Sequence, residues 1–191
     1  MLSFTRKLLM FCAALVAAPL CMPANAPAAD GGKQPLVAYF SKSGNTEALA
    51  DMIHKEVGGQ ILQIKPVKPY PADYQQTVDL AKEEQKSNAR PAIEAKINPD
   101  DYSVIFLGFP NWWSSMPMPV YTFIEESKLN GHTIIPFLTH GGGGQAHAVS
   151  DLKKLCPQSK ILPVLAVSGS QASSSQKEVS KWLKDLGPAI R

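Results

Sequence analysis

Apolar and polar positions alternate between two periods along most of the chain. Short runs of strand-forming residues, such as 36–40 and 103–108, are separated by longer stretches in which apolar residues recur every three or four positions. The first of these stretches, 46–57, ends at a pair of glycines, which favours the end of a helix. A continuous apolar run such as 103–108 is typical of a strand that is buried on both faces of a sheet.

The pattern predicts strands and helices that alternate along the chain. The expected strands are 36–40, 60–64, 103–108, 133–138 and 161–167. The expected helices are 46–57, 74–87, a segment containing 120–124 that is entered after Pro119, about 146–155, and 175–186. Strands separated by helices form right-handed βαβ units, so we expect an α/β fold with one parallel sheet. Pro136 counts against the fourth strand, because proline donates no hydrogen bond to a ladder.

The first thirty residues have a composition of their own. Arg6 and Lys7 precede an uncharged, mostly apolar stretch, 8–20, and small residues and prolines follow it. This order is typical of a secretory signal peptide, and the apolar stretch is shorter than the about twenty residues that a membrane-spanning helix needs. We therefore expect residues 1–28 to be a signal peptide cleaved after Ala28, and the mature protein to be exported, to the periplasm. An uncleaved anchor is the alternative.

Composition places the rest of the chain among soluble globular domains. Hydrophobic residues make up 45% and charged residues 18% of the sequence, and residues 29–191 are long enough for one domain. Once Arg6 and Lys7 are removed, 17 basic residues face 16 acidic ones, with no basic cluster of the kind that binds nucleic acid. Cys156 is the only cysteine after residue 28, which excludes an internal disulfide or a cysteine-based metal site. We expect it to face the core at a helix end.

A polar loop follows the first predicted strand and runs straight into a helix. Residues 41–46 read Ser-Lys-Ser-Gly-Asn-Thr, so hydroxyl and amide donors surround Gly44, and no acid lies among them. Backbone amides at a helix start converge on anions, which makes a phosphate the expected ligand. The alternative is an ordinary capped helix start, for which Asn and Thr are suited.

Two further loops follow the third and fourth predicted strands. The first contains Trp112 and Trp113 between prolines and offers an apolar surface to a planar ligand, with indole N–H groups as hydrogen-bond donors; the alternative is that both rings plug the loop onto the core. The second, 139–145, holds four consecutive glycines, so that the backbone itself approaches a ligand, unless the segment is only a flexible turn. Parallel sheets bind ligands beyond the carboxyl ends of their strands. We therefore expect one pocket for a phosphate and a flat ring.

The tracts SKSGNT, GFPNWWSSMPMPVYTFIE and FLTHGGGGQAHAVSDLKKLCP together resemble the flavodoxin family, and its periplasmic flavodoxin-like branch in particular. The resemblance extends over about residues 36–186. It implies a flavodoxin-like, doubly wound, five-stranded parallel sheet of order 2-1-3-4-5 with helices on both faces, the order established for flavodoxin, and FMN at the point where the order reverses.

The resemblance also implies which residues hold FMN. Those expected around the phosphate are Ser41, Lys42, Ser43, Gly44, Asn45 and Thr46. Those expected along one side of the isoalloxazine are Pro110, Asn111, Trp112, Trp113, Ser114 and Ser115. Those expected at its pyrimidine edge are Thr139, His140, Gly141, Gly142 and Gly143. No catalytic side chain and no metal are needed, because the flavin carries the chemistry.

The implied function is that of an exported FMN-binding protein that transfers electrons through its flavin to a partner protein or a small-molecule acceptor. An FMN-dependent NAD(P)H:quinone or nitro-compound oxidoreductase is the first alternative, and a non-catalytic FMN-binding protein the second.

Two features depart from the family pattern. Relatives often have glycine after the tryptophan pair, where this chain has Ser114. Because a residue with a β-carbon resists the left-handed backbone, we expect weaker stabilisation of the half-reduced flavin. The near-neutral charge of the mature chain differs from the acidic surface of electron-carrier flavodoxins and implies weaker electrostatic steering.

Overall fold

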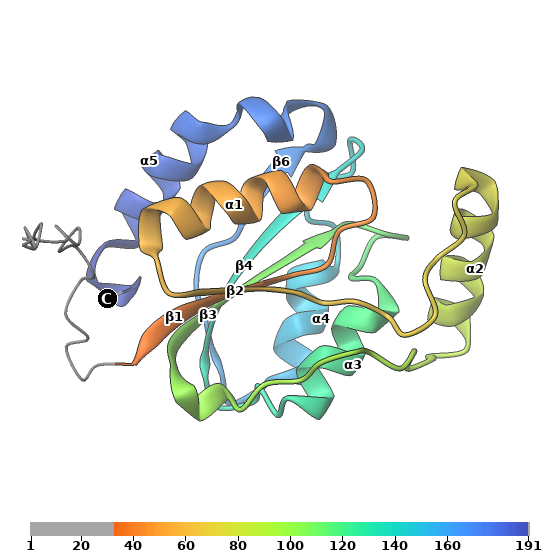
Figure 1. Ribbon diagram of the computed structural model, residues 1–191, viewed down its shortest axis with the longest axis horizontal. Helices are drawn as coiled ribbons and strands as arrows, with labels where there is room; N and C mark the ends of the chain where they lie inside the picture. Colours follow the sequence, from red (N-terminus) through yellow and green to blue (C-terminus); the bar gives the residue numbers. More distant parts are fainter. Residues whose placement is uncertain (1–32, 191) are drawn as a thin grey trace, which may run out of the picture. The chain divides into compact units, whose positions relative to one another are not determined.

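The computed structural model describes residues 33–190 (Figure 1). The expected signal peptide, residues 1–28, and its cleavage point lie outside the described residues. The strands are β1 (Gln34–Tyr39), β2 (Gln60–Gln63), β3 (Tyr102–Pro110), β4 (Thr133–His140), β5 (Lys160–Ile161) and β6 (Leu165–Ser168). All pair in parallel in the order β2-β1-β3-β4-β5, with β6 also paired to β4. The predicted flavodoxin-like sheet order is confirmed.

The last strand, expected as one segment over 161–167, is instead two short pieces. The Ile134 carbonyl of β4 accepts a hydrogen bond from the Leu162 N–H (3.0 Å), and pairing resumes only where Phe137 lies opposite Leu165. The gap falls beside Pro136, which has no N–H to donate. Pro136 is therefore accommodated inside β4, at the place where the neighbouring strand is interrupted.

Four helices cover the two faces of the sheet (Figure 1). They are α1 (Asn45–Val57) and α5 (Gln176–Leu186) on one face, and α3 (Met118–Glu126) and α4 (Ala148–Leu155) on the other. Short 3-10 turns lie at Pro99–Asp101, Gly169–Ser174 and Gly187–Ile190. The four inward positions predicted for α5 are all buried: Val179, Trp182, Leu183 and Leu186.

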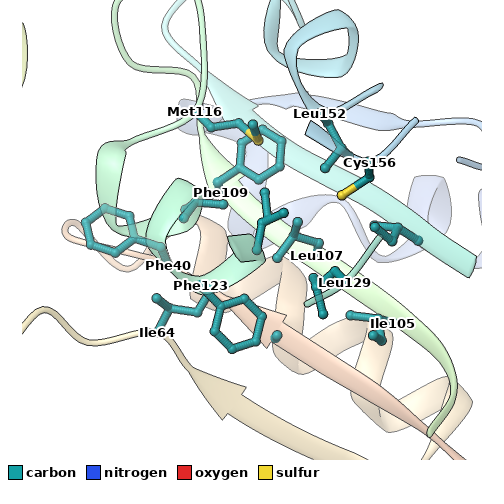
Figure 2. Close-up of a cluster of buried hydrophobic side chains, with 14 of the residues drawn as sticks. Phe40, Ile64, Ile105, Leu107, Phe109, Met116, Phe123, Leu129, Leu152 and Cys156 are labelled. Atoms are coloured by element: carbon teal, nitrogen blue, oxygen red, sulfur yellow. The ribbon is translucent and has the colours of Figure 1, made fainter. Parts of the chain in front are cut away.

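The hydrophobic core lies on both sides of β3 and β4. Ile105 and Leu107 point into the cluster beneath α3 and α4, whereas Phe106 between them joins the cluster beneath α1 and α5. Figure 2 shows the first cluster, in which Phe109 and Cys156 also lie. Cys156 ends α4 and is only 1% exposed, and burial raises the pKa of its thiol. Its predicted place in the core is confirmed.

The helix α2 (Tyr74–Lys86) stands apart from these layers (Figure 1). Thr77 and Ala81 are its only buried residues, and none of its side chains belongs to either core cluster. Tyr74, which begins the expected apolar face of this helix, is 79% exposed. The face predicted for α2 exists, but the sheet does not cover it.

Candidate functional site

The polar loop between β1 and α1 turns sharply back on itself. Gly44 has φ +83°, and its N–H donates to the Ser41 hydroxyl (3.1 Å). A positive φ suits glycine and brings the chain directly into α1 at Asn45. The loop side chains Lys42 and Ser43 are exposed. The helix start and its amides thus face outward beside two potential ligands of an anion.

Three of the predicted loops meet at Thr139, at the end of β4. The buried hydroxyls of Thr46 and Thr139 lie 2.9 Å apart and share a hydrogen bond, and the Asn111 N–H donates to the Thr139 carbonyl (2.7 Å). Thr46 is therefore fixed within the protein, where its hydroxyl joins two strand ends. The loops after β1, β3 and β4 are brought to one place, as the sequence predicts.

The tryptophan pair lies in a tight hairpin that ends β3. The backbones of Trp112 and Ser115 exchange hydrogen bonds of 2.9 and 3.0 Å, and Trp113 and Ser114 between them have φ of +50° and +66°. Left-handed backbone at both central positions is the mark of a type I′ turn, which favours glycine or asparagine. The expectation that Ser114 resists this region is wrong, because the folded protein already places it there.

The two tryptophan rings are held on different supports. Trp112 packs edge-to-face against Phe40 and Tyr70, with ring centroids 5.4 and 5.1 Å apart. The Trp113 indole N–H donates to the Val78 carbonyl of α2 (3.1 Å). The expected use of indole N–H groups as ligand donors is wrong for Trp113, whose N–H bonds α2 instead.

A hydrogen-bonded cluster holds the hairpin from behind. The buried Ser115 hydroxyl donates to the Asp151 carboxylate of α4 (2.7 Å) and pairs with the Tyr121 hydroxyl of α3 (2.9 Å). Partial burial alone would raise the pKa of Asp151, but hydrogen bonds from Lys154 and Ser115 outweigh it and hold that pKa below its usual value. Ser115 therefore anchors the hairpin to two helices.

The glycine-rich loop is open on its outer side. A β-carbon added at Gly141 or Gly142 would meet no protein atom within 4 Å. The loop is tied down by the Asn111 side-chain amide, which donates to the Gly144 carbonyl (2.6 Å). The Nδ1 atom of His140 accepts from the Gly142 N–H (3.1 Å), so this histidine has a structural hydrogen bond within the loop.

Two adjoining cavities lie among these loops. The first, about 370 Å³, reaches toward α2 and we name it the α2 lobe; the second, about 540 Å³, reaches toward the glycine loop and we name it the glycine-loop lobe. Their shared lining consists of Ser43, Tyr74, Pro110, Asn111 and Trp112. The α2 lobe is further lined by Ser41, Lys42, Thr46, Thr77, Val78, Ala81 and Trp113. The glycine-loop lobe is further lined by Asn45, Thr139, His140, Gly141, Ser168, Gly169 and Ser170.

Most of the residues expected from the sequence line one lobe or the other. Those that line neither are Gly44, Ser114, Ser115, Gly142 and Gly143. Two walls were missed. One is the face of α2, whose apolar spacing was taken to point into a core; the other is the loop after β6, which the rule of inspecting each strand end was sufficient to find. A β-carbon on Gly169 in that loop would lie 2.8 Å from the Asn45 amide nitrogen.

The electrostatics of the two lobes favour an anion. Among the residues that line them, Lys42 is the one with a permanently charged side chain, and no Asp or Glu is present. The cation lies at the same loop that exposes the start of α1, where the helix dipole is positive. Within residues 33–190, no group of three or more His, Cys, Asp or Glu side chains is arranged to hold a metal ion.

A doubly wound parallel sheet with an anion loop after β1 and an aromatic hairpin after β3 defines a class of flavin-binding α/β proteins. This chain belongs to the flavodoxin family, since the family model described as flavodoxin matches residues 34–186. The family match supports FMN as its cofactor.

Solved structures agree with this assignment. A candidate flavoprotein from Bacteroides eggerthii DSM 20697 is 32% identical over 81% of this chain and 98% of its own, with a TM-score of 0.70. A second, from Bacteroides uniformis ATCC 8492, is 32% identical over 80% and 99%, with a TM-score of 0.71. A flavoprotein in complex with FMN from Lactobacillus acidophilus NCFM shares the fold at 24% identity over 75% and 98%, with a TM-score of 0.63. No curated protein matched the sequence significantly.

Proposed function

We propose that this protein is an exported FMN-dependent redox protein that transfers electrons through its flavin. The observation that carries the proposal is the meeting of the anion loop, the tryptophan hairpin and the glycine loop at Thr139. This point lies where the sheet order reverses between β1 and β3, the place at which such sheets bind nucleotides. FMN supplies the redox chemistry, and the protein binds it and sets its environment.

Each loop has a separate part in holding FMN. The amides at the start of α1, the Ser43 hydroxyl and the Lys42 ammonium group would hold the phosphate, in a loop without acids. Trp112 would form a flat wall for the ring. The open backbone at Gly141 would hydrogen-bond the polar edge of the ring, since no side chain stands in the way there.

Stepwise reduction of the FMN-loaded protein tests the proposal. Under anaerobic conditions the bound flavin should be reduced and then reoxidised fully and reversibly, at a potential different from that of free FMN. Failure to retain FMN, or a potential equal to that of free FMN, would contradict a redox role for this site.

An FMN-dependent oxidoreductase of small molecules is a second candidate, and the α2 lobe favours it. This cavity adjoins the glycine-loop lobe and has space for a small second molecule. Export argues against NAD(P)H as the electron donor, because nicotinamide cofactors are scarce outside the cytoplasm. Measuring NAD(P)H oxidation in the presence of a quinone distinguishes the candidates: steady turnover supports the enzyme, and its absence supports the electron carrier.

The exported location rests on the sequence of residues 1–28. The structure adds that no helix within residues 33–190 is long and apolar enough to cross a bilayer. Cell fractionation tests the location: the protein should be found in the periplasm as a chain shortened at residue 28, and deleting residues 2–28 should keep it in the cytoplasm. A full-length chain retained in the cytoplasm would contradict the proposal.

A further inference from the structure

The two lobes of the site differ in what they offer a ligand. The wall that α2 contributes is built mainly from Tyr74, Val78 and Ala81, spaced four and three residues apart so that they share one helix face. Trp113, 43% exposed, continues this wall from the hairpin. The α2 side of the cavity is therefore apolar and aromatic.

The polar groups on this wall are already bonded within the protein. The Thr77 hydroxyl donates to the carbonyls of Pro71 and Asp73 (2.8 and 2.9 Å), and the Trp113 N–H donates to the Val78 carbonyl. A ligand against this wall thus gains contact area and stacking rather than directional hydrogen bonds.

The glycine-loop lobe has the opposite character. Ser168 and Ser170 add hydroxyls, Asn45 adds an amide, and the open backbone at Gly141 adds peptide groups. The phosphate, the ribityl chain and the pyrimidine edge of FMN all need such partners, because buried polar groups without them are costly. FMN is therefore best satisfied in the glycine-loop lobe and along the wall that both lobes share.

This assignment leaves the α2 lobe free, and its construction needs a reason. An apolar helix face that joins neither core cluster, with Tyr74 79% exposed, is typical of a surface that binds something. The cavity volume of about 370 Å³ lies within the range of small-molecule pockets. The shared residues Pro110 and Trp112 place any occupant beside the flavin.

We propose that the α2 lobe binds an uncharged, flat aromatic molecule of the quinone class next to FMN, with Tyr74, Val78 and Trp113 as its walls. The proposal rests on the proposed function, since it assigns FMN to the other lobe. It names a small molecule, and no macromolecule, as the redox partner that enters this site.

The test measures binding of duroquinone to the oxidised, FMN-loaded full chain. All ring carbons of duroquinone are substituted, so it does not add to thiols. Val78→Arg places a charge in the α2 lobe but keeps the backbone carbonyl that Trp113 needs. Gln75→Arg is the matched control, because Gln75 is an exposed residue of α2 that lines neither lobe.

The wild-type protein and Gln75→Arg should bind duroquinone equally, and Val78→Arg should bind it at least about tenfold more weakly, by 1.4 kcal/mol or more. All three should bind FMN within about twofold of one another, which also shows that they are folded. Absence of duroquinone binding to the wild type, or equal binding to Val78→Arg, would overturn the proposal and leave the proposed function intact.

Loss of FMN from Val78→Arg alone would also overturn it, since the α2 lobe would then belong to the flavin. If the wild type bound no FMN, the proposed function would fail instead. Duroquinone binding to that FMN-free protein, weakened by Val78→Arg, would still support the α2 lobe as an aromatic site.

Discussion

Ser43 and Thr46 occupy the same loop but contribute differently to the protein. Ser43 is exposed and lines both lobes, whereas Thr46 is buried and bonded to Thr139. Removing both hydroxyls at once would combine a loss of ligand contact with a loss of stability. The Ser43 hydroxyl alone is the clean probe of phosphate binding.

Ser43→Ala should weaken FMN binding about ten- to a hundredfold, the effect of one hydrogen bond to a charged group. Riboflavin, which lacks the phosphate, should bind the variant as it binds the wild type. Ser174→Ala, at an exposed serine remote from both lobes, is the control for both titrations. Equal weakening of the two flavins would show that this loop does not hold the phosphate.

Ser114 bears a backbone cost in the folded state that glycine would not. A residue with a β-carbon loses about 1–2 kcal/mol in the left-handed region, part of which glycine loses again through its greater freedom in the unfolded chain. Ser114→Gly should therefore raise the free energy of unfolding by about 1 kcal/mol, measured in urea. Ser114→Ala, which keeps the β-carbon, should leave it unchanged, and destabilisation by glycine would refute this explanation.

The open backbone at Gly141 allows a test of the ring edge. Gly142 has φ +119°, so a side chain there strains the loop whatever it binds, whereas Gly141 has free space and no positive φ. Gly141→Val should keep the melting temperature and weaken FMN binding about tenfold or more, since its side chain fills the space of the ring edge. Unchanged FMN affinity would mean that the loop does not contact the flavin.

At the scale of elements, α4 and the hairpin are coupled through Ser115 and Asp151. The hairpin backbone is strained, and the contacts from α3 and α4 hold it in place. A further bond joins the start of α4 to the turn, because the His147 N–H donates to the Ser114 carbonyl (2.8 Å). The position of the tryptophans therefore depends on helices that do not touch the flavin.

This coupling predicts a dependence of stability on pH. The pKa of Asp151 is lowered in the folded protein, so its contribution is present above the unfolded pKa, about 3.9, and is lost as the pH falls through the lower folded pKa. Asp151→Asn should unfold at lower urea than the wild type at pH 7, and the difference should shrink below about pH 4. Asp185→Asn, at an exposed acid of α5, should show no such convergence, and a difference independent of pH would contradict the ionic explanation.

Hydrophobic spacing predicted most of the secondary structure within one or two residues, because the two periods directly reflect which side of an element is buried. It failed where a neighbour decides. The break between β5 and β6 depends on Pro136 in the facing strand. The apolar face of α2 was visible in the sequence, but only the long-range path of the chain shows that it borders a cavity.

At the scale of the whole molecule, the strand order and the identity of the ligand came from resemblance, whereas the βαβ pattern alone predicted only a parallel sheet. The site follows from that order, because β1 and β3 are neighbours whose connections leave in opposite directions. The loops at their ends were therefore predictable as a site. The hydrogen bonds that use the Trp113 N–H and the Ser115 hydroxyl within the protein depend on α2 and α4, and no local pattern indicates them.

The most direct test of the account is a calorimetric titration of the flavin-free protein with FMN and, separately, with riboflavin. One FMN should bind per chain, at least about tenfold more tightly than riboflavin, because the loop after β1 holds the phosphate. Equal affinities for the two flavins, or no binding of FMN, would contradict the account at its centre.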